Sequence, residues 1–133
     1  MKPRYEDKME EKIVLSDLPK TWIFDLDGTI VKHNGYKIDG ADTLLLGVEE
    51  FMEKVAQGDM IIFLTSRTDQ EKERTENFLR KHHIPYDAII YNAPYGERIL
   101  VNDRKPSGLR TAVAINTQRD TFLKNIFEID KNL

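Results

Sequence analysis

Hydrophobic positions along the chain form short continuous runs that alternate with longer segments of helical periodicity. Residues 22–24, 60–64 and 88–91 are apolar runs of strand length. Apolar residues recur at helical spacing over about 43–57, and a second helical segment runs from Asp69 to about His82. Strands that alternate with helices in this way predict a parallel sheet.

Further along the chain, residues 99–101 and 112–115 predict two more buried strands, and residues 117–129 predict a last helix. The dipeptide Asn34-Gly35 within 31–38 predicts a hairpin turn between short extended pieces. The predicted fold class is therefore α/β, a three-layer Rossmann-like parallel sheet with helices on both faces. Ligands of such sheets bind beyond the carboxyl ends of the strands.

The composition predicts one globular domain. The chain has 133 residues, 40% of them hydrophobic and 32% charged, which suffices for one core over 21–133. Residues 1–20 are polar and charged, and we interpret them as an N-terminal extension that is either an ordered helix or a loose arm. No apolar run approaches the length of a membrane span or a signal peptide, so we expect a cytoplasmic protein with no membrane partner.

The cysteine content and the net charge limit which reactions and binding partners the protein can have. The sequence has no cysteine, so covalent catalysis would have to use oxygen or nitrogen nucleophiles. The formal net charge of -3 argues against bulk binding of nucleic acid, which needs a basic face. A small phosphorylated molecule or a glycan stays open as a partner.

The segment Asp25-Leu26-Asp27-Gly28-Thr29 follows the first predicted strand directly. Side chains two residues apart in a strand point the same way, so Asp25 and Asp27 can be presented together at its end. Two carboxylates held this close repel, which favours a cation beside them. The alternative is a pair of solvated acids at an ordinary Asp-Gly turn.

Polar residues follow three of the predicted strands. Asp25 and Asp27 follow the first, Thr65-Ser66 the second, and Asn102-Asp103 a later one. Because the carboxyl ends of parallel strands meet at one edge of the sheet, these groups are expected to converge on one crevice.

The order of these motifs resembles the haloacid dehalogenase superfamily of aspartate-dependent phosphohydrolases, over residues 22–115. Asp25 and Asp27 match its first motif, Thr65 its second and Asp103 its acidic fourth. Residues 99–106 also resemble a subgroup of capsule-biosynthesis phosphatases. The narrower resemblance suggests a role in polysaccharide biosynthesis.

The resemblance implies a two-step phosphoryl transfer. Asp25 would attack phosphorus to form an aspartyl-phosphate, and Asp27 would act first as general acid and then as general base. Mg²⁺ would be held by Asp25, Asp27 through its backbone carbonyl, and Asp103. Thr65 and Ser66 would bind the phosphate, Thr65 through its hydroxyl and the residues after it through backbone N–H groups.

The chain departs from the family at the third motif, a lysine that neutralises the phosphate. No lysine lies between Lys81 and Lys105. We favour Lys105 for this role, with Arg98 and Arg67 as rivals. Without such a cation, a non-catalytic or slowly turning-over phosphate-binding domain becomes the alternative function.

The resemblance also indicates a capless enzyme, because the spacing between motifs leaves no room for an inserted cap domain. An open site implies a bulky substrate or a partner subunit, in a homo-oligomer, that closes the entrance. The leading hypothesis is a Mg²⁺-dependent phosphomonoesterase acting on a phosphorylated sugar or another polar metabolite. Two alternative functions stay open, phosphotransfer to an acceptor other than water and a phospho-receiver or binding module.

Tyr36 lies on the predicted hairpin. Its side chain could contact the leaving group or simply be solvated.

Overall fold

The computed structural model describes residues 12–133, which separate into two compact units. Unit 2 comprises Pro19–Tyr95 and Gln118–Phe122. Unit 1 comprises the described residues up to Leu18, together with Gly96–Thr117 and Leu123–Leu133. The prediction of an N-terminal extension over 1–20 lies in part outside the described residues, and the prediction of one domain over 21–133 stays a prediction. Each unit is described by itself.

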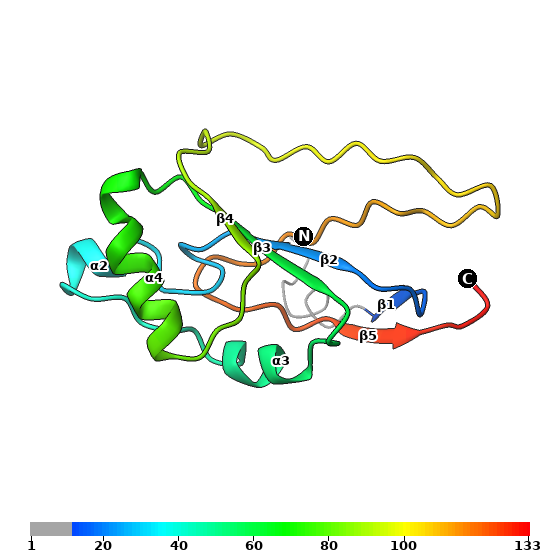
Figure 1. Ribbon diagram of the computed structural model, residues 1–133, viewed down its shortest axis with the longest axis horizontal. Helices are drawn as coiled ribbons and strands as arrows, with labels where there is room; N and C mark the ends of the chain where they lie inside the picture. The colour runs from blue at the N-terminus through cyan, green and yellow to red at the C-terminus, as the bar shows by residue number, and fades with distance from the viewer. Residues whose placement is uncertain (1–11) are drawn as a thin grey trace, which may run out of the picture. The chain divides into compact units, whose positions relative to one another are not determined.

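Unit 2 is built on a parallel sheet of strands β2 (Thr21–Phe24), β3 (Met60–Leu64) and β4 (Ala88–Ile90), in that spatial order (Figure 1). The register pairs Phe24 with Phe63 and Leu64 with Ile90. Three strands predicted from apolar runs are thus confirmed, as is a parallel α/β arrangement. The carboxyl ends of β2 and β3 lie side by side.

The aromatic core lies on one face of this sheet. Paired residues of neighbouring strands share a face, and Phe24 and Phe63 are both buried, with ring centroids 6.0 Å apart. Phe51 contacts Phe24 edge-on at 5.9 Å. On the opposite face Ile23 is 50% and Ile90 is 52% exposed. The sheet is therefore well buried on one face and half-exposed on the other, whereas the sequence predicts helices over both.

The helices of unit 2 are shorter than their hydrophobic patterns suggest. Helix α3 spans Val48–Lys54 and helix α4 spans Lys72–Lys81, after a 3₁₀ turn, η1, at Asp69–Glu71. The predicted helix over 43–57 begins late because the backbone N–H of Leu45 donates to Ile30 at 2.9 Å, outside any helix. Gly47, with φ 96°, then starts α3.

The predicted hairpin over 31–38 is wrong. Asn34 adopts the left-handed conformation, with φ 54°, but a single helical turn follows it, α2 (Gly35–Ile38). Asparagine tolerates this conformation in many kinds of turn, so the dipeptide signal did not specify a hairpin. The pairing occurs further out, where Val31 forms an antiparallel bridge with Leu44.

Unit 1 contains a parallel pair of strands, β1 (Lys12–Leu15) and β5 (Ile126–Ile129). Residues 12–15 are thus neither helix nor loose arm. The predicted helix over 117–129 is also wrong, because its second half pairs with β1 instead. Phe122, in the first half of the predicted helix, is 5% exposed and belongs to unit 2.

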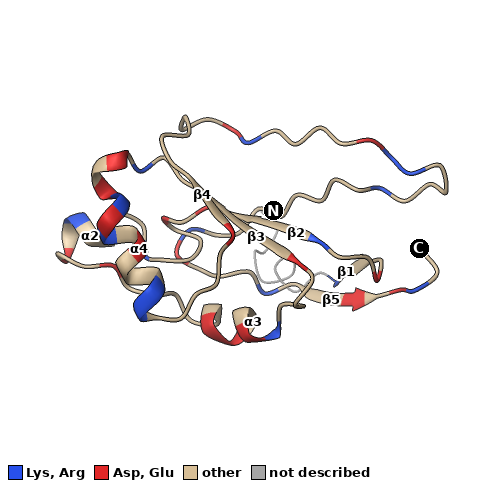
Figure 2. Ribbon diagram, viewed as in Figure 1, with Lys and Arg blue, Asp and Glu red and all other residues tan. Residues whose placement is uncertain are grey.

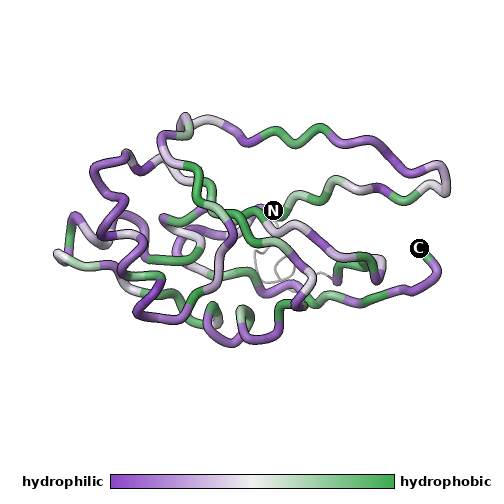
Figure 3. The backbone as a smooth tube through the Cα atoms, in the orientation of Figure 1, coloured by the Kyte–Doolittle hydropathy of each residue, from purple (hydrophilic) through white to green (hydrophobic). Residues whose placement is uncertain are grey.

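Residues 96–117 form one long extended loop without helix or strand (Figure 1). The strands predicted at 99–101 and 112–115 are therefore absent from this structure, because apolar sequence forms a strand only where another strand accepts its backbone hydrogen bonds. Figure 3 shows hydrophobic stretches within this loop. Ile99 is 84% and Val101 is 89% exposed. Within residues 12–133, no helix is both long and apolar enough to span a bilayer.

Candidate functional site

The acidic pair lies where β2 ends, beside the end of β3. Asp25 and Asp27 are both partly exposed, while Leu26 between them is buried. Gly28 then turns the chain with φ 86°, and its backbone N–H donates to Val31 at 2.7 Å. The left-handed backbone at Gly28 explains why glycine follows the pair.

The segment Gln118–Phe122 packs against this turn. The backbone N–H of Asp120 donates to the carbonyl of Gly28 at 2.8 Å, and its carboxylate accepts from the backbone N–H of His33 at 2.7 Å. A Cβ at Gly28 would lie 3.3 Å from the Cγ of Arg119. The exposed Arg119 side chain therefore starts beside the acidic turn, which the sequence did not predict.

Thr65 and Ser66 follow β3, as predicted. Thr65 is 1% exposed, and its hydroxyl accepts a hydrogen bond from the backbone N–H of Arg67 at 3.1 Å. A hydroxyl that accepts one bond keeps its proton to donate. The Ser66 hydroxyl lies 3.5 Å from the carbonyl oxygen of Pro94.

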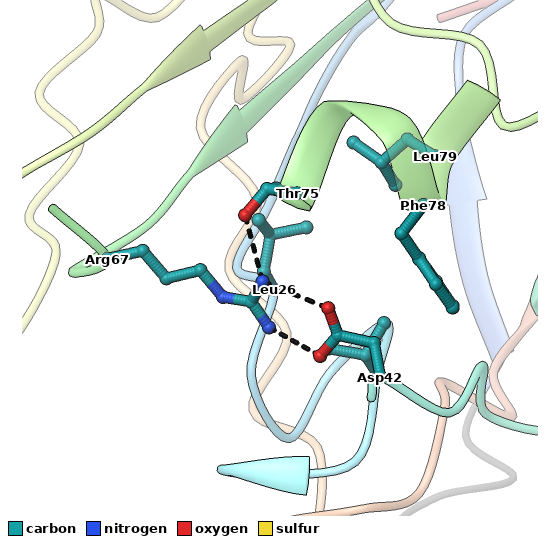
Figure 4. A pocket seen from close by; sticks show the side chains of 7 residues that line it. Leu26, Asp42, Arg67, Thr75, Phe78 and Leu79 are labelled. Atoms are coloured by element: carbon teal, nitrogen blue, oxygen red, sulfur yellow. Dashed lines mark hydrogen bonds and ion pairs between the residues drawn. The ribbon is translucent and has the colours of Figure 1, made fainter. Parts of the chain in front are cut away.

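Arg67 links the end of β3 to the acidic pair. Its Nε donates to Oδ2 of Asp27 at 3.0 Å, and its Nη2 donates to Oδ1 of the same carboxylate at 2.9 Å. The adjoining side of the guanidinium, formed by Nη1 and Nη2, binds both oxygens of Asp42, at 3.1 and 2.7 Å. Nη1 also donates to the hydroxyl of Thr75, on α4, at 2.9 Å (Figure 4).

Burial and charge compete at Arg67. Burial alone would lower the pKa of the Arg67 guanidinium, but the hydrogen bonds and opposite charges of Asp27 and Asp42 outweigh it and raise the pKa above its ordinary value. The ring of Tyr36 lies 4.4 Å from the guanidinium carbon of Arg67 and 5.4 Å from that of Arg74. Arg67 is thus a permanent cation, and Tyr36 belongs to this cluster.

These contacts bear on the cation predicted to neutralise the phosphate. A guanidinium has five N–H donors, and in Arg67 each of them has an acceptor among Asp27, Asp42 and Thr75. Arg67 can therefore bind a substrate phosphate only by giving up one of these bonds. Its rivals Lys105 and Arg98 are exposed residues of unit 1.

Asp103, the predicted fourth motif, also belongs to unit 1. It is exposed, and its backbone carbonyl accepts a hydrogen bond from the hydroxyl of Thr111. A turn follows, in which the backbone N–H of Gly108 donates to Lys105 at 2.8 Å. Asp103 and Lys105 thus lie on the extended loop, and their convergence with Asp25 stays a prediction.

The donors at the end of β2 suit a hard cation. Asp25 offers a carboxylate, and the backbone carbonyl of Asp27 takes no part in the bridge to Val31, which uses the carbonyl of Leu26 and the N–H of Gly28. Oxygen donors of this kind are preferred by Mg²⁺. In the part of the chain that the structure describes, no three Asp, Glu, His or Cys side chains are grouped closely enough to hold a metal ion. Unit 2 thus offers oxygen donors at this end of β2 but no complete set of side-chain ligands among the described residues.

Sequence reasoning missed Asp42 and Thr75, which hold Arg67. Asp42 lies in a polar loop that gives no periodic signal, although its side chain is only 2% exposed. Thr75 offers a weak signal, because it occupies the same buried face of α4 as Leu79, four residues later. A polar residue on the apolar face of a helix needs a buried partner, and Arg67 is that partner.

A cavity of about 190 Å³ lies elsewhere in unit 2, between α3 and the residues after α4. Its lining includes Glu49, Glu53, His82 and His83, and Figure 2 shows acidic residues along α3. None of the predicted site residues lines it.

Comparisons with known proteins give limited similarity. No family model matches the chain, and no curated protein matches it. Among solved structures it is similar to a chain of the "Structure of Pnkp1/Rnl/Hen1 complex", with 32% identity and a TM-score of 0.49, over 62% of this chain and 31% of that chain. A chain of the "Structure of the Pnkp1/Rnl/Hen1 RNA repair complex" has 30% identity and a TM-score of 0.49, over 68% of this chain and 31% of that one. The protein thus spans about a third of the chains it matches.

Proposed function

We propose that the protein is a Mg²⁺-dependent phosphomonoesterase of the haloacid dehalogenase type, without a cap domain, that works through an aspartyl-phosphate. The observation that carries the proposal is the parallel register of β2 and β3, which sets Asp25 and Asp27 beside Thr65 at one edge of the sheet. Acidic and hydroxyl groups gathered at the carboxyl ends of parallel strands form the usual ligand position of such sheets.

The reaction divides between the two acids. In the first step a carboxylate oxygen of Asp25 forms a bond to phosphorus, the bond from phosphorus to the ester oxygen breaks, and Asp27 gives its proton to the departing alkoxide. In the second step Asp27 takes a proton from water, whose oxygen attacks phosphorus. The bond to Asp25 then breaks, which releases inorganic phosphate and restores both carboxylic groups.

A magnesium ion would be held by Asp25, the backbone carbonyl of Asp27 and Asp103. When bound, it offsets the repulsion between the attacking carboxylate and the phosphate dianion and orients the two. Thr65 would donate its hydroxyl proton to a phosphoryl oxygen, and the backbone at Ser66 would add a further donor.

The donors that Arg67 already uses support a different residue as the cation that neutralises the phosphate. Because Arg67 has an acceptor for every N–H, we assign this role to Lys105, with Arg98 and Arg119 as the competing candidates. Arg119 enters because its side chain starts beside Gly28. One assay separates the three candidates by comparing Lys105→Ala, Arg98→Ala and Arg119→Ala. Only removal of the residue that binds the phosphate should lower kcat by about a hundredfold or more.

The substrate we propose is a phosphorylated sugar or similar polar metabolite, in keeping with the resemblance to capsule-biosynthesis phosphatases. A second candidate, a slow or non-catalytic phosphate-binding domain, is favoured by one contact. Both carboxylate oxygens of Asp27 are bound by Arg67, which leaves fewer lone pairs of this carboxylate for a substrate or a water molecule.

Phosphate release from an aryl phosphate and from a panel of sugar phosphates, with Mg²⁺ or with chelator, tests the function. We expect release that needs Mg²⁺ and that Asp25→Asn abolishes. Asp69→Asn, at an exposed aspartate on η1, is the matched control and should be as active as the wild type. Absence of release from every ester, or an unchanged rate in Asp25→Asn, would overturn the phosphatase and leave the binding domain.

A further inference from the structure

We infer that Asp42 is a positioning residue for the acid–base step and acts on Asp27 through Arg67. The inference rests on the proposed function, because it assigns a role within the same site. The contacts that carry it all lie within unit 2.

The guanidinium of Arg67 is held from two sides. Asp27 binds one side through both carboxylate oxygens, and Asp42 binds the adjoining side through both of its own. Bidentate pairs of this kind fix the plane of the guanidinium relative to each carboxylate. Asp27 and Asp42 are therefore fixed relative to each other by one rigid group.

The two carboxylates differ in access to solvent. The Asp42 side chain is 2% exposed, whereas the Asp27 side chain is 18% exposed. Arg67 itself is 2% exposed at its side chain, and its remaining N–H binds Thr75 on α4. Asp42 and Thr75 thus anchor the buried side of Arg67, and Asp27 is the member that solvent and a substrate can reach.

Charge explains why a second carboxylate is needed. Arg67 alone beside Asp27 would neutralise the acid that must exchange protons. With both carboxylates ionised, the three groups carry a formal charge of -1, since two negative charges share one positive charge. Asp42 therefore shares the positive charge of Arg67 with Asp27, and the two-oxygen contacts fix the orientation of the Asp27 carboxylate.

A misplaced general acid has a distinctive kinetic effect. An alkyl phosphate has a poor leaving group, which must receive a proton as the ester bond breaks. A nitrophenyl phosphate has a good leaving group, which departs without one. A defect in the position of Asp27 therefore slows hydrolysis of the alkyl ester far more than that of the aryl ester, whereas general structural damage slows both alike.

The test compares kcat for nitrophenyl phosphate and glycerol phosphate in the full chain, with Mg²⁺ present. For Asp42→Asn we expect about a tenfold or greater loss on glycerol phosphate and less than about a threefold loss on nitrophenyl phosphate. Asp42→Glu should recover part of the loss. The control is Asp39→Asn, three residues before Asp42. Asp39 is a solvent-exposed ion-pair partner of Lys32, and its substitution should leave the ratio of the two rates unchanged.

Equal losses on both esters, or none, would overturn the inference. If Asp42→Asn does not fold, Thr75→Val takes its place, because it removes one hydrogen bond to Arg67 and no charge.

If the wild type hydrolyses neither ester, the proposed function fails, and crystal structures of the variants decide whether Asp42 positions Asp27. The positioning role is supported if the two-oxygen contact between Asp27 and Arg67 is lost in Asp42→Asn and kept in Asp39→Asn. It is refuted if Asp42→Asn keeps this contact.

Discussion

Residues 60–95 and residues 96–117 have similar apolar content in sequence, yet only the first region forms strands and a core. In the first, β3 is paired on both sides, by β2 and β4, and Ile61 and Phe63 are at most 3% exposed. In the second, the apolar run 99–101 is extended and exposed.

The difference shows that a hydrophobic run becomes a strand only where a neighbouring strand accepts its backbone hydrogen bonds, and that β3, with a neighbour on each edge, is the most buried. One ion-paired residue from each unit shows a similar contrast. In unit 2 the buried guanidinium of Arg67 has an acceptor for every N–H, whereas in unit 1 the ion pair of Lys12 and Glu128 leaves both side chains more than half exposed. Buried polar groups must be paired, whereas exposed ones need no partner.

Arg67→Met gives the largest expected loss of stability. Removal of the guanidinium leaves Asp27 and Asp42 facing each other without a counter-ion, which should cost about 3–5 kcal/mol in the free energy of unfolding. Lys12→Met, in the exposed pair of unit 1, should cost less than about 1 kcal/mol. Urea unfolding of both variants measures the contrast, and equal losses would mean that the Arg67 cluster is not buried in solution.

Ile61→Ala and Ile99→Ala form a matched pair across the two regions. Ile61 is 3% exposed and Ile99 is 84% exposed. We expect a loss of about 2–5 kcal/mol for the buried isoleucine and less than about 0.5 kcal/mol for the exposed one. A loss above about 2 kcal/mol at Ile99 would show that this run is packed in solution, as a strand would be.

Gly28→Ala tests the turn after the acidic pair. The alanine would have to keep φ at 86°, and its Cβ would approach Arg119 to 3.3 Å. We expect a loss of about 1–3 kcal/mol in stability. Gly40→Ala is the control for backbone strain alone, since Gly40 has φ 80° but no atom within 4 Å of a Cβ. A smaller loss at Gly28 than at Gly40 would contradict the close packing of 118–122 on the turn.

Tyr91→Phe should give the smallest effect, and one that depends on pH. Burial, and then the hydrogen bond to Glu76 with its negative charge, raise the pKa of Tyr91 above its ordinary value. A raised pKa in the folded state stabilises the protein below the unfolded pKa of about 10, and this stabilisation is lost as the pH rises above it. The wild type should exceed Tyr91→Phe by about 1 kcal/mol at pH 8, with a smaller margin at pH 11. Thermal melts at both pH values measure the margin, and a constant margin would contradict the bond.

Much of unit 2 could be predicted from the sequence. The runs at 22–24, 60–64 and 88–91 are strands because each has partners within the same sheet. The predicted meeting of the first two strand ends is confirmed by the contact of Asp27 with Arg67. The alternating α/β pattern was sufficient to predict that these strands pair, because consecutive parallel strands are usually neighbours in a sheet.

The rest depended on tertiary contacts that no local pattern encodes. Residues 126–129 form β5 because β1, more than a hundred residues earlier, supplies their hydrogen bonds. Asp42 joins the cluster through a loop, and Tyr36 through a helical turn in place of the predicted hairpin. Such contacts are set by the assembled fold, so their residues carried no periodic signal beforehand.

The central claim is that Asp25 is the nucleophile of a phosphoryl transfer. Acid quenching of the protein during turnover of a ³²P-labelled phosphate ester, followed by peptide mapping, tests it directly. We predict label on the peptide that contains Asp25, in the wild type and not in Asp25→Asn. Rapid hydrolysis of the same ester with no labelled protein, or with label on another peptide, would contradict the account.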